Sequence, residues 1–139
     1  MKLTRLGILG AALLVAGCSS DLVAPSAETL QGSWAVMDEV PGSGEIWDLT
    51  VQGASISGSG GWTGEACCSG TLSLTGAISG DSIHLDLTFV VTNSANPRPP
   101  FHQHFDGALT SRTQLRGTVR NDDGTSAVER LQRKTGPTS

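Results

Sequence analysis

Strict alternation of apolar and polar residues in short runs is the feature that most constrains how this chain can fold. In the clearest run, 81–92, the odd positions from Ile83 to Val91 are all apolar, whereas positions 84, 86 and 88 hold histidine, aspartate and threonine. Successive side chains of a β-strand point to opposite faces, so this pattern predicts a strand with one buried face. Similar runs recur, separated by turn-forming Gly, Asp, Asn and Ser residues. We expect strands over 32–40, 45–52, 54–62, 72–78, 81–92, 101–109, 113–121 and 126–134.

The spacing of these runs predicts how the strands connect. Gly80-Asp81 fits a two-residue hairpin turn. Placing residue 87 opposite 105 also brings 83 opposite 109 and 91 opposite 101, so that apolar residues face each other along this hairpin. About eight sequential strands can close up-and-down, which removes exposed sheet edges and leaves an interior that is packed or holds one small ligand. The sequence therefore predicts an all-β fold, an antiparallel up-and-down barrel of about eight strands.

The first residues predict export from the cytoplasm. Lys2 and Arg5 are the only charged residues before Cys18, and the run 6–17 is apolar or small. A positive head, a short apolar stretch and a small-residue exit are typical of a secretory signal peptide. The run is shorter than the roughly twenty residues that a transmembrane helix needs.

Val15-Ala16-Gly17-Cys18 resembles the bacterial lipoprotein box. The resemblance implies that Cys18 is acylated and becomes the new N-terminus, and that Ser19 favours the periplasmic face of the outer membrane. An ordinary cleaved signal with an incidental cysteine is the alternative. Several acyl chains would anchor the chain firmly, because each buried methylene contributes about 0.8 kcal/mol. The chain then divides into a signal peptide (1–17), a lipidated cysteine with its flexible tether (18–29), the barrel domain (30–135) and a tail (136–139).

Charge is unevenly placed along the mature chain. Residues 18–97 contain nine acids and no lysine or arginine, whereas residues 98–139 contain seven basic residues and four acids. A net acidic protein is a poor candidate for binding nucleic acid, because that affinity depends on neutralising phosphates. The split indicates either a basic binding face or, if the first and last strands pair, opposite charges that meet across that seam.

The segment from Leu30 to Trp34 resembles the Gly-x-Trp opening of the lipocalin and avidin (calycin) barrels. In those families the tryptophan closes one end of the barrel and packs on an arginine from the last strand. Leu131-Gln132-Arg133 is similar to that closing strand, so the resemblance implies that Trp34 and Arg133 form an end plug. Stacking of a guanidinium plane on an indole face is favourable. The chain has no tyrosine and few of the aromatic and polar groups that avidins use for biotin.

Aromatic residues at inward positions are the candidates for a ligand site. Trp47 and Trp62 fall on apolar faces of neighbouring strands, nearly opposite each other if the chain turns near Gly53. They could line a pocket or fill the core. Glu129 points inward if Arg133 does, and Val128 and Arg130 point inward if it does not. Glycines at inward positions either leave a cavity or let strands bend. The candidate ligand-binding residues are Trp47, Trp62, Phe89, Phe105 and Glu129.

Two smaller groups of residues have chemistry of their own. Cys67 and Cys68 are adjacent and have only each other as partners once Cys18 carries lipid. They predict a disulfide, which could be inert or redox-labile, or a pair of soft-metal ligands. His102 and His104 share an outward face near Asp86 and are weak candidates for binding a metal.

No arrangement of residues in the sequence supports catalysis. We find no nucleophile elbow, no phosphate loop and no convergent pair of carboxylates. We therefore expect a protein that is not an enzyme and has no cofactor. The expected partners are the membrane, through the lipid on Cys18, and either a small apolar or amphipathic ligand in the barrel or another envelope protein.

Overall fold

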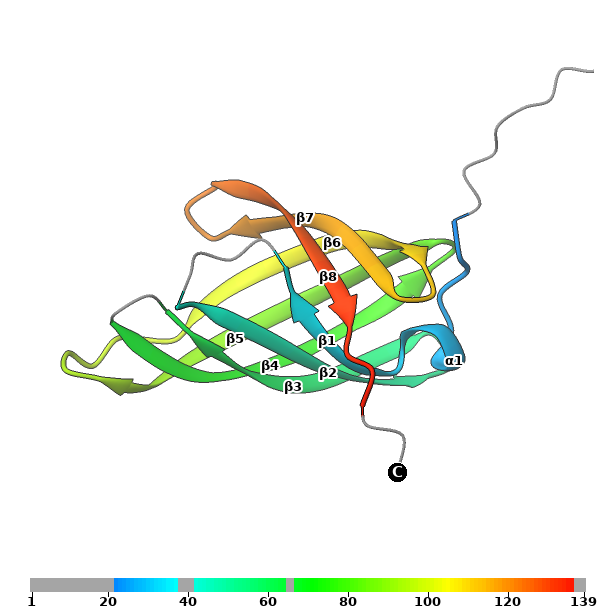
Figure 1. Ribbon diagram of the computed structural model, residues 1–139. Coiled ribbons are helices and arrows are strands. Elements are labelled where there is room, and N and C mark those ends of the chain that lie inside the picture. The colour runs from blue at the N-terminus through cyan, green and yellow to red at the C-terminus, as the bar shows by residue number, and fades with distance from the viewer. Residues whose placement is uncertain (1–21, 38–41, 65–66, 137–139) are drawn as a thin grey trace, which may run out of the picture.

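The computed structural model, which describes residues 22–37, 42–64 and 67–136, shows one closed antiparallel barrel with a short helix at one end (Figure 1). Each strand pairs with the next in the sequence, and the last pairs with the first, so the all-β, up-and-down barrel that the alternation predicted is confirmed. The elements are α1 (Ala27–Leu30), β1 (Gly32–Val36), β2 (Gly44–Gln52), β3 (Ser55–Thr63), β4 (Cys68–Ser79), β5 (Ser82–Ser94), β6 (Phe101–Ser111), β7 (Gln114–Asn121) and β8 (Ser126–Arg133).

The pairing of β1 with β8 closes the barrel. Trp34 lies opposite Arg133, Ala35 opposite Gln132 and Val36 opposite Leu131. Without this short seam the sheet would expose two unpaired edges, which are sites of aggregation. The predicted hairpin turn at Gly80-Asp81 forms, with Ser79 opposite Ser82.

The inward residues of the strands form a single hydrophobic core. Trp34, Trp47 and Phe105 are its largest fully buried side chains. Their partners are aliphatic residues of the alternating runs, each of which contributes about 1.5–3 kcal/mol when it leaves water. The core therefore uses the same alternation that specified the strands.

Inward glycines of β6 and β7 make room for one aromatic ring. Gly107 lies opposite Gly117, and the ring of Phe105 covers both. A Cβ atom added at Gly107 would stand 2.4 Å from Cζ of Phe105, and one added at Gly117 would stand 2.5 Å from the same atom. Here the small residues do not leave a cavity, because the ring fills their space.

The predicted register of the β5–β6 hairpin is wrong by two residues. Leu85, and not residue 87, lies opposite Phe105, and Phe89 lies opposite Phe101. A shift of two preserves which face each side chain occupies, so the apolar faces still meet. The β5–β6 pairing ends at Phe89, and β5 continues to Ser94 paired only with β4 on its other edge.

The helix α1 was not expected from the sequence. Residues 27–29 belong to the predicted tether, yet Thr29 is only 8% exposed and Leu30 is fully buried against the core. The ordered domain therefore begins before residue 30. The predicted signal peptide, Cys18 and residues 137–139 of the tail lie outside the described residues. Within the part that is described, no helix has the length and apolarity to cross a membrane.

Replacing Gly107 with alanine should destabilise the barrel by about 1–3 kcal/mol, because the new methyl group meets both the Phe105 ring and the Arg116 carbonyl oxygen, 2.6 Å away. The matched control is Gly61→Ala on β3, where the nearest atom to the new Cβ is the Gly70 oxygen at 3.8 Å. Urea unfolding of both variants measures the difference. Equal stabilities of the two variants would contradict the packing of Phe105 on these glycines.

Candidate functional site

The two ends of the barrel differ in how they are covered. The closed end carries α1 together with the β2–β3, β4–β5 and β6–β7 turns, whereas the distal end carries the β5–β6 connection and the β7–β8 turn (Figure 1). The closed end contains one aromatic side chain, Trp34, and the distal end contains a group of three. The closed end is sealed by polar contacts, and the distal end presents part of its aromatic surface to solvent.

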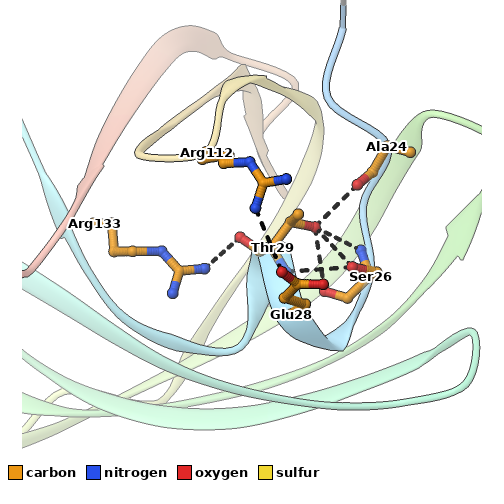
Figure 2. Close-up of polar contacts among 6 residues, drawn as sticks. All are labelled: Ala24, Ser26, Glu28, Thr29, Arg112 and Arg133. Carbon is orange, nitrogen blue, oxygen red and sulfur yellow. Dashed lines mark hydrogen bonds and ion pairs between the residues drawn. The ribbon is translucent and has the colours of Figure 1, made fainter.

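Trp34 and Arg133 form a plug at the closed end. Trp34 is fully buried, and its Nε1–H donates a hydrogen bond of 2.8 Å to the carbonyl oxygen of Leu30. The guanidinium carbon of Arg133 lies 4.9 Å from the centre of the Trp34 ring. Nη2 of Arg133 donates to the carbonyl oxygen of Thr29 (Figure 2). The calycin resemblance implied this packing of Trp34 on Arg133. The structure adds α1, whose carbonyl oxygens at Thr29 and Leu30 accept the hydrogen bonds of both side chains.

The start of the ordered domain is fixed to this plug through α1. The Ser26 hydroxyl accepts a hydrogen bond from the Thr29 amide, and the Thr29 hydroxyl accepts one from the Ser26 amide. Thr29 also donates to the carbonyl oxygen of Ala24, 2.9 Å away. On the outside of α1, Glu28 pairs with Arg112 at 3.5 Å (Figure 2). The capping box satisfies amides that so short a helix would otherwise leave unpaired.

Three aromatic rings meet at the distal end. Phe89 and Phe101 are stacked, with centroids 4.7 Å apart and planes within 3° of parallel. Trp62 stands edge-on to both, at 6.2 Å from Phe89 and 5.8 Å from Phe101. Phe89 is buried, but Phe101 is 38% exposed. We call these three residues the distal aromatic cluster.

Trp62 carries an unsatisfied donor. Its Nε1 is buried and has no hydrogen-bond partner. The nitrogen lies over Gly70, 2.7 Å from where a Cβ would stand at that residue. A buried N–H without an acceptor costs about 1–3 kcal/mol, so this orientation of the indole is retained against a penalty.

Polar side chains share the inward face with the distal aromatic cluster. Glu45 lies opposite Trp62 in the β2–β3 pair and accepts a hydrogen bond from Nε1 of Trp47. On the other side of the barrel, Gln103 donates to Asn121 at 2.8 Å. A shallow, open depression of about 530 Å³ at this end of β2–β4 is lined by ten residues. They include Glu45 and Trp62 but also the outward residues Asp48 and Thr63, and neither Phe89 nor Phe101 is among them.

The structure places Glu129 on the inner face of β8. It lies opposite Gly117 and is half-buried, while Val128 is 55% exposed on the outside. The alternative alternation, with Val128 and Arg130 inside, is therefore wrong. Glu129 and Glu45 lie on the two strands, β8 and β2, that pair with β1 on either side.

The five candidate ligand-binding residues do not form one group. Trp47 and Phe105 are fully buried and pack edge to face at 5.2 Å, as core residues below the distal end. Trp62 and Phe89 belong to the distal aromatic cluster. The chain turns at Gly53 as expected, and Trp47 and Trp62 are diagonal neighbours on the inner face, because Trp47 faces Gly60 and Trp62 faces Glu45. Sequence reasoning did not include Phe101, whose inward position in the alternating run was a usable signal.

Cys67 and Cys68 are joined by a disulfide in the β3–β4 connection. The amide of Gly64 donates to the carbonyl oxygen of Cys68 at 2.8 Å, which closes this connection beside the distal end. With their sulfur atoms bonded to each other, the two cysteines are not available as thiolate ligands in this state.

The outer face of β5 and β6 carries two histidine–aspartate pairs. Nδ1 of His104 lies 2.5 Å from Oδ1 of Asp86, and Nδ1 of His84 lies 2.5 Å from Oδ1 of Asp106. Arg120 of β7 also pairs with Asp106. The sequence reasoning missed the second pair because it used the wrong register. His102 contacts Thr88 at 3.1 Å.

The histidine face does not assemble a metal site. Across residues 22–37, 42–64 and 67–136, no three His, Cys, Asp or Glu side chains are arranged to hold a metal ion. The pKa of Asp106 is lowered chiefly by its hydrogen bond with His84; burial opposes this change and the charge of Arg120 adds to it.

The expected meeting of opposite charges at the β1–β8 seam stays a prediction, because the acids that follow β1 lie outside the described residues. The described ion pairs join β5, β6 and β7, and α1 to the β6–β7 turn. At the β1–β8 seam, the acids Asp38 and Glu39 lie outside the described residues.

A second depression, of about 420 Å³, lies beside Arg116 and Arg130 on β7 and β8 and has no aromatic residue in its lining.

Comparison with known proteins gives no match: neither a protein-family model, nor a curated protein, nor a solved structure matches this chain significantly. The function is therefore argued from the residues and their geometry.

Replacing Arg133 with lysine should lower the free energy of unfolding by about 1–3 kcal/mol, because an ammonium group cannot stack on Trp34 while donating to Thr29. The control is Arg112→Lys, which alters an exposed pair with Glu28 and should change stability by no more than about 0.5 kcal/mol. Urea denaturation compares both with wild type. The plug has no special role if the two variants lose equal stability.

The stability that Asp106 contributes should disappear in acid. Its folded pKa is lowered from 3.8, so the contribution is full above that value and is lost as the pH falls through the lower folded value. We expect Asp106→Asn to be less stable than wild type at neutral pH by less than about 1 kcal/mol, since the site is partly exposed. In unfolding experiments the two proteins should begin to converge as the pH falls below 3.8 and should coincide below the lowered folded pKa. A difference that stays constant down to pH 2 would refute this assignment.

Proposed function

We propose that this protein is a lipoprotein, anchored through Cys18 to the periplasmic face of the outer membrane, whose barrel binds a small amphipathic ligand at its distal end. The anchor is supported by the positive head, the short apolar run and the Val15–Cys18 motif. The calycin-like architecture supports a binding role by analogy only, since one fold serves many functions.

The distal aromatic cluster is the observation that carries the binding proposal. Phe101 is 38% exposed although its neighbour Phe89 is buried against it, so one ring of the stack remains accessible to a ligand. Stacking on an accessible aromatic face buries apolar area and adds about 0.5–1.5 kcal/mol for a second ring. The apolar part of the ligand therefore lies on Phe101 and Trp62.

Polar groups beside the cluster account for the amphipathic character of the ligand. Glu45 of β2 and Trp62 of the neighbouring strand β3 line the same depression of about 530 Å³. The buried indole N–H of Trp62 lacks an acceptor, which a ligand oxygen could supply if the ring turns. Trp47 and Phe105 fill the barrel below, so the ligand occupies the end of the barrel and not its centre.

A packed core also favours the second candidate function, contact with another envelope protein. Val90 on β5 and Val128 on β8 are 41% and 55% exposed, although both belong to strands with charged and polar outer faces. Exposed apolar side chains of this kind are typical of contact surfaces when they gather into a patch. Here they lie on different strands, which is why we place ligand binding first.

Native and denaturing mass spectrometry of residues 19–139, exported behind an ordinary cleaved signal, tests the proposal. We expect extra mass under native conditions that disappears on denaturation. Phe101→Ala should abolish it, because the accessible ring of the stack is lost. Val90→Ala, an equally exposed apolar residue on the outer face of β5, is the matched control and should retain it.

Which variants keep the extra mass distinguishes the two functions. If Phe101→Ala keeps it, the ligand does not bind at the distal end. Absence of any extra mass in the wild type, together with a partner captured by cross-linking near Val90 or Val128, would favour contact with an envelope protein.

A further inference from the structure

We infer that the closed end of the barrel faces the lipid bilayer and that the distal end faces away from it, toward the aqueous compartment. The inference rests on the proposed anchor at Cys18 and deepens the proposed function, because it decides which side supplies the ligand. A ligand would reach the distal aromatic cluster from water or from a soluble partner, and not directly from the membrane that holds the protein.

The first step is where the ordered chain leaves the tether. Val23 packs on the hydrophobic core, and the carbonyl oxygen of Ala24 accepts the hydroxyl of Thr29. From there the chain enters α1, which Arg133 and Arg112 hold from two sides (Figure 2). The tether is therefore fixed to the closed end, and not attached to a free strand that could swing along the barrel.

The second step is the length of the tether. Four residues lie between Cys18 and Val23, so five steps along the chain reach at most about 18 Å when fully extended. The longest strand, β5, has 13 residues; at about 3.3 Å per residue and a tilt near 40° it spans roughly 33 Å along the barrel axis. A domain turned with its distal end on the bilayer would hold Val23 farther from the surface than the tether can reach.

The third step is the charge at each end. The basic residues at the closed end exceed the acids; they are Arg112, Arg133 and Lys134, against Glu28 and Asp81. At the distal end the described acids exceed the described bases by one; the acids are Glu45, Asp122 and Asp123, and the bases are Arg98 and Arg120. An anionic lipid surface attracts the first arrangement and repels the second, by about 1 kcal/mol for each basic residue near the surface. Tether attachment, reach and charge thus favour the same orientation.

Fluorescence quenching in vesicles tests the orientation on the full lipidated chain. Asp81→Cys, on the β4–β5 turn, places a thiol-reactive fluorophore at the closed end, and Asp122→Cys, on the β7–β8 turn, places it at the distal end. The two variants are matched, because each replaces an exposed turn aspartate and removes one charge. The Cys67–Cys68 disulfide does not react without a reductant. Phospholipids with a nitroxide on the headgroup act as the quencher.

We expect several-fold stronger quenching at position 81 than at position 122. Insertion of a Gly/Ser-rich segment after Asp21 should reduce this contrast, because a longer tether lets the domain turn over. Equal quenching at both positions, or stronger quenching at position 122, would overturn the orientation while leaving the anchor intact. A mature chain whose mass lacks acyl chains would overturn the anchor itself, and the orientation with it, whether or not the barrel binds a ligand.

Discussion

The short seam between β1 and β8 is the constraint on which the rest of the structure depends. Among the described residues three register pairs join these strands, and one of them sets Trp34 beside Arg133. Backbone hydrogen bonds from Met37 to Arg130 and from Lys134 to Ser33 extend the seam at both ends. The stacked guanidinium and the hydrogen bonds to Thr29 and Leu30 hold both strands against α1, so the seam is supported from the end of the barrel as well as along it. Without closure, the inward residues of the neighbouring strands would lose the opposite wall that buries them.

The two ends of the barrel differ in how their aromatic residues are covered. The plug buries Trp34 completely and pairs its indole N–H with the Leu30 carbonyl oxygen, although Nε of Arg133 is buried without a partner. At the distal end Phe101 stays partly exposed and the Trp62 N–H has no acceptor. Among the described residues the two buried donors without a partner, Nε1 of Trp62 and Nε of Arg133, lie at opposite ends of the barrel. What distinguishes the distal end is the partly exposed ring of Phe101 beside its unpaired donor. The tether joins the barrel at the closed end, next to the plug. The proposed membrane attachment and the proposed ligand site therefore lie at opposite ends of the barrel.

The core shows why the barrel can be both small and full. Phe105 occupies the space above Gly107 and Gly117, and Trp47 packs against its edge. Paired glycines and large rings together fill the interior, which a uniform set of medium-sized side chains would fill less well. The same packing confines the depression that includes Trp62 and Glu45 to the end of β2–β4.

The sequence by itself determined the strands, their inward faces and the closed barrel, because a side-chain period of two leaves only one way to bury the apolar residues. It also indicated Trp34 and Arg133 through a resemblance. The tertiary structure alone decided the register of β5 and β6, the His84–Asp106 pair and the inclusion of Phe101 in the cluster, because a shift of two residues leaves every face unchanged. It alone decided that α1 forms. A four-residue helix is stable only with outside support, which here comes from the Ser26 cap and from the hydrogen bond that Arg133 donates to the Thr29 carbonyl oxygen.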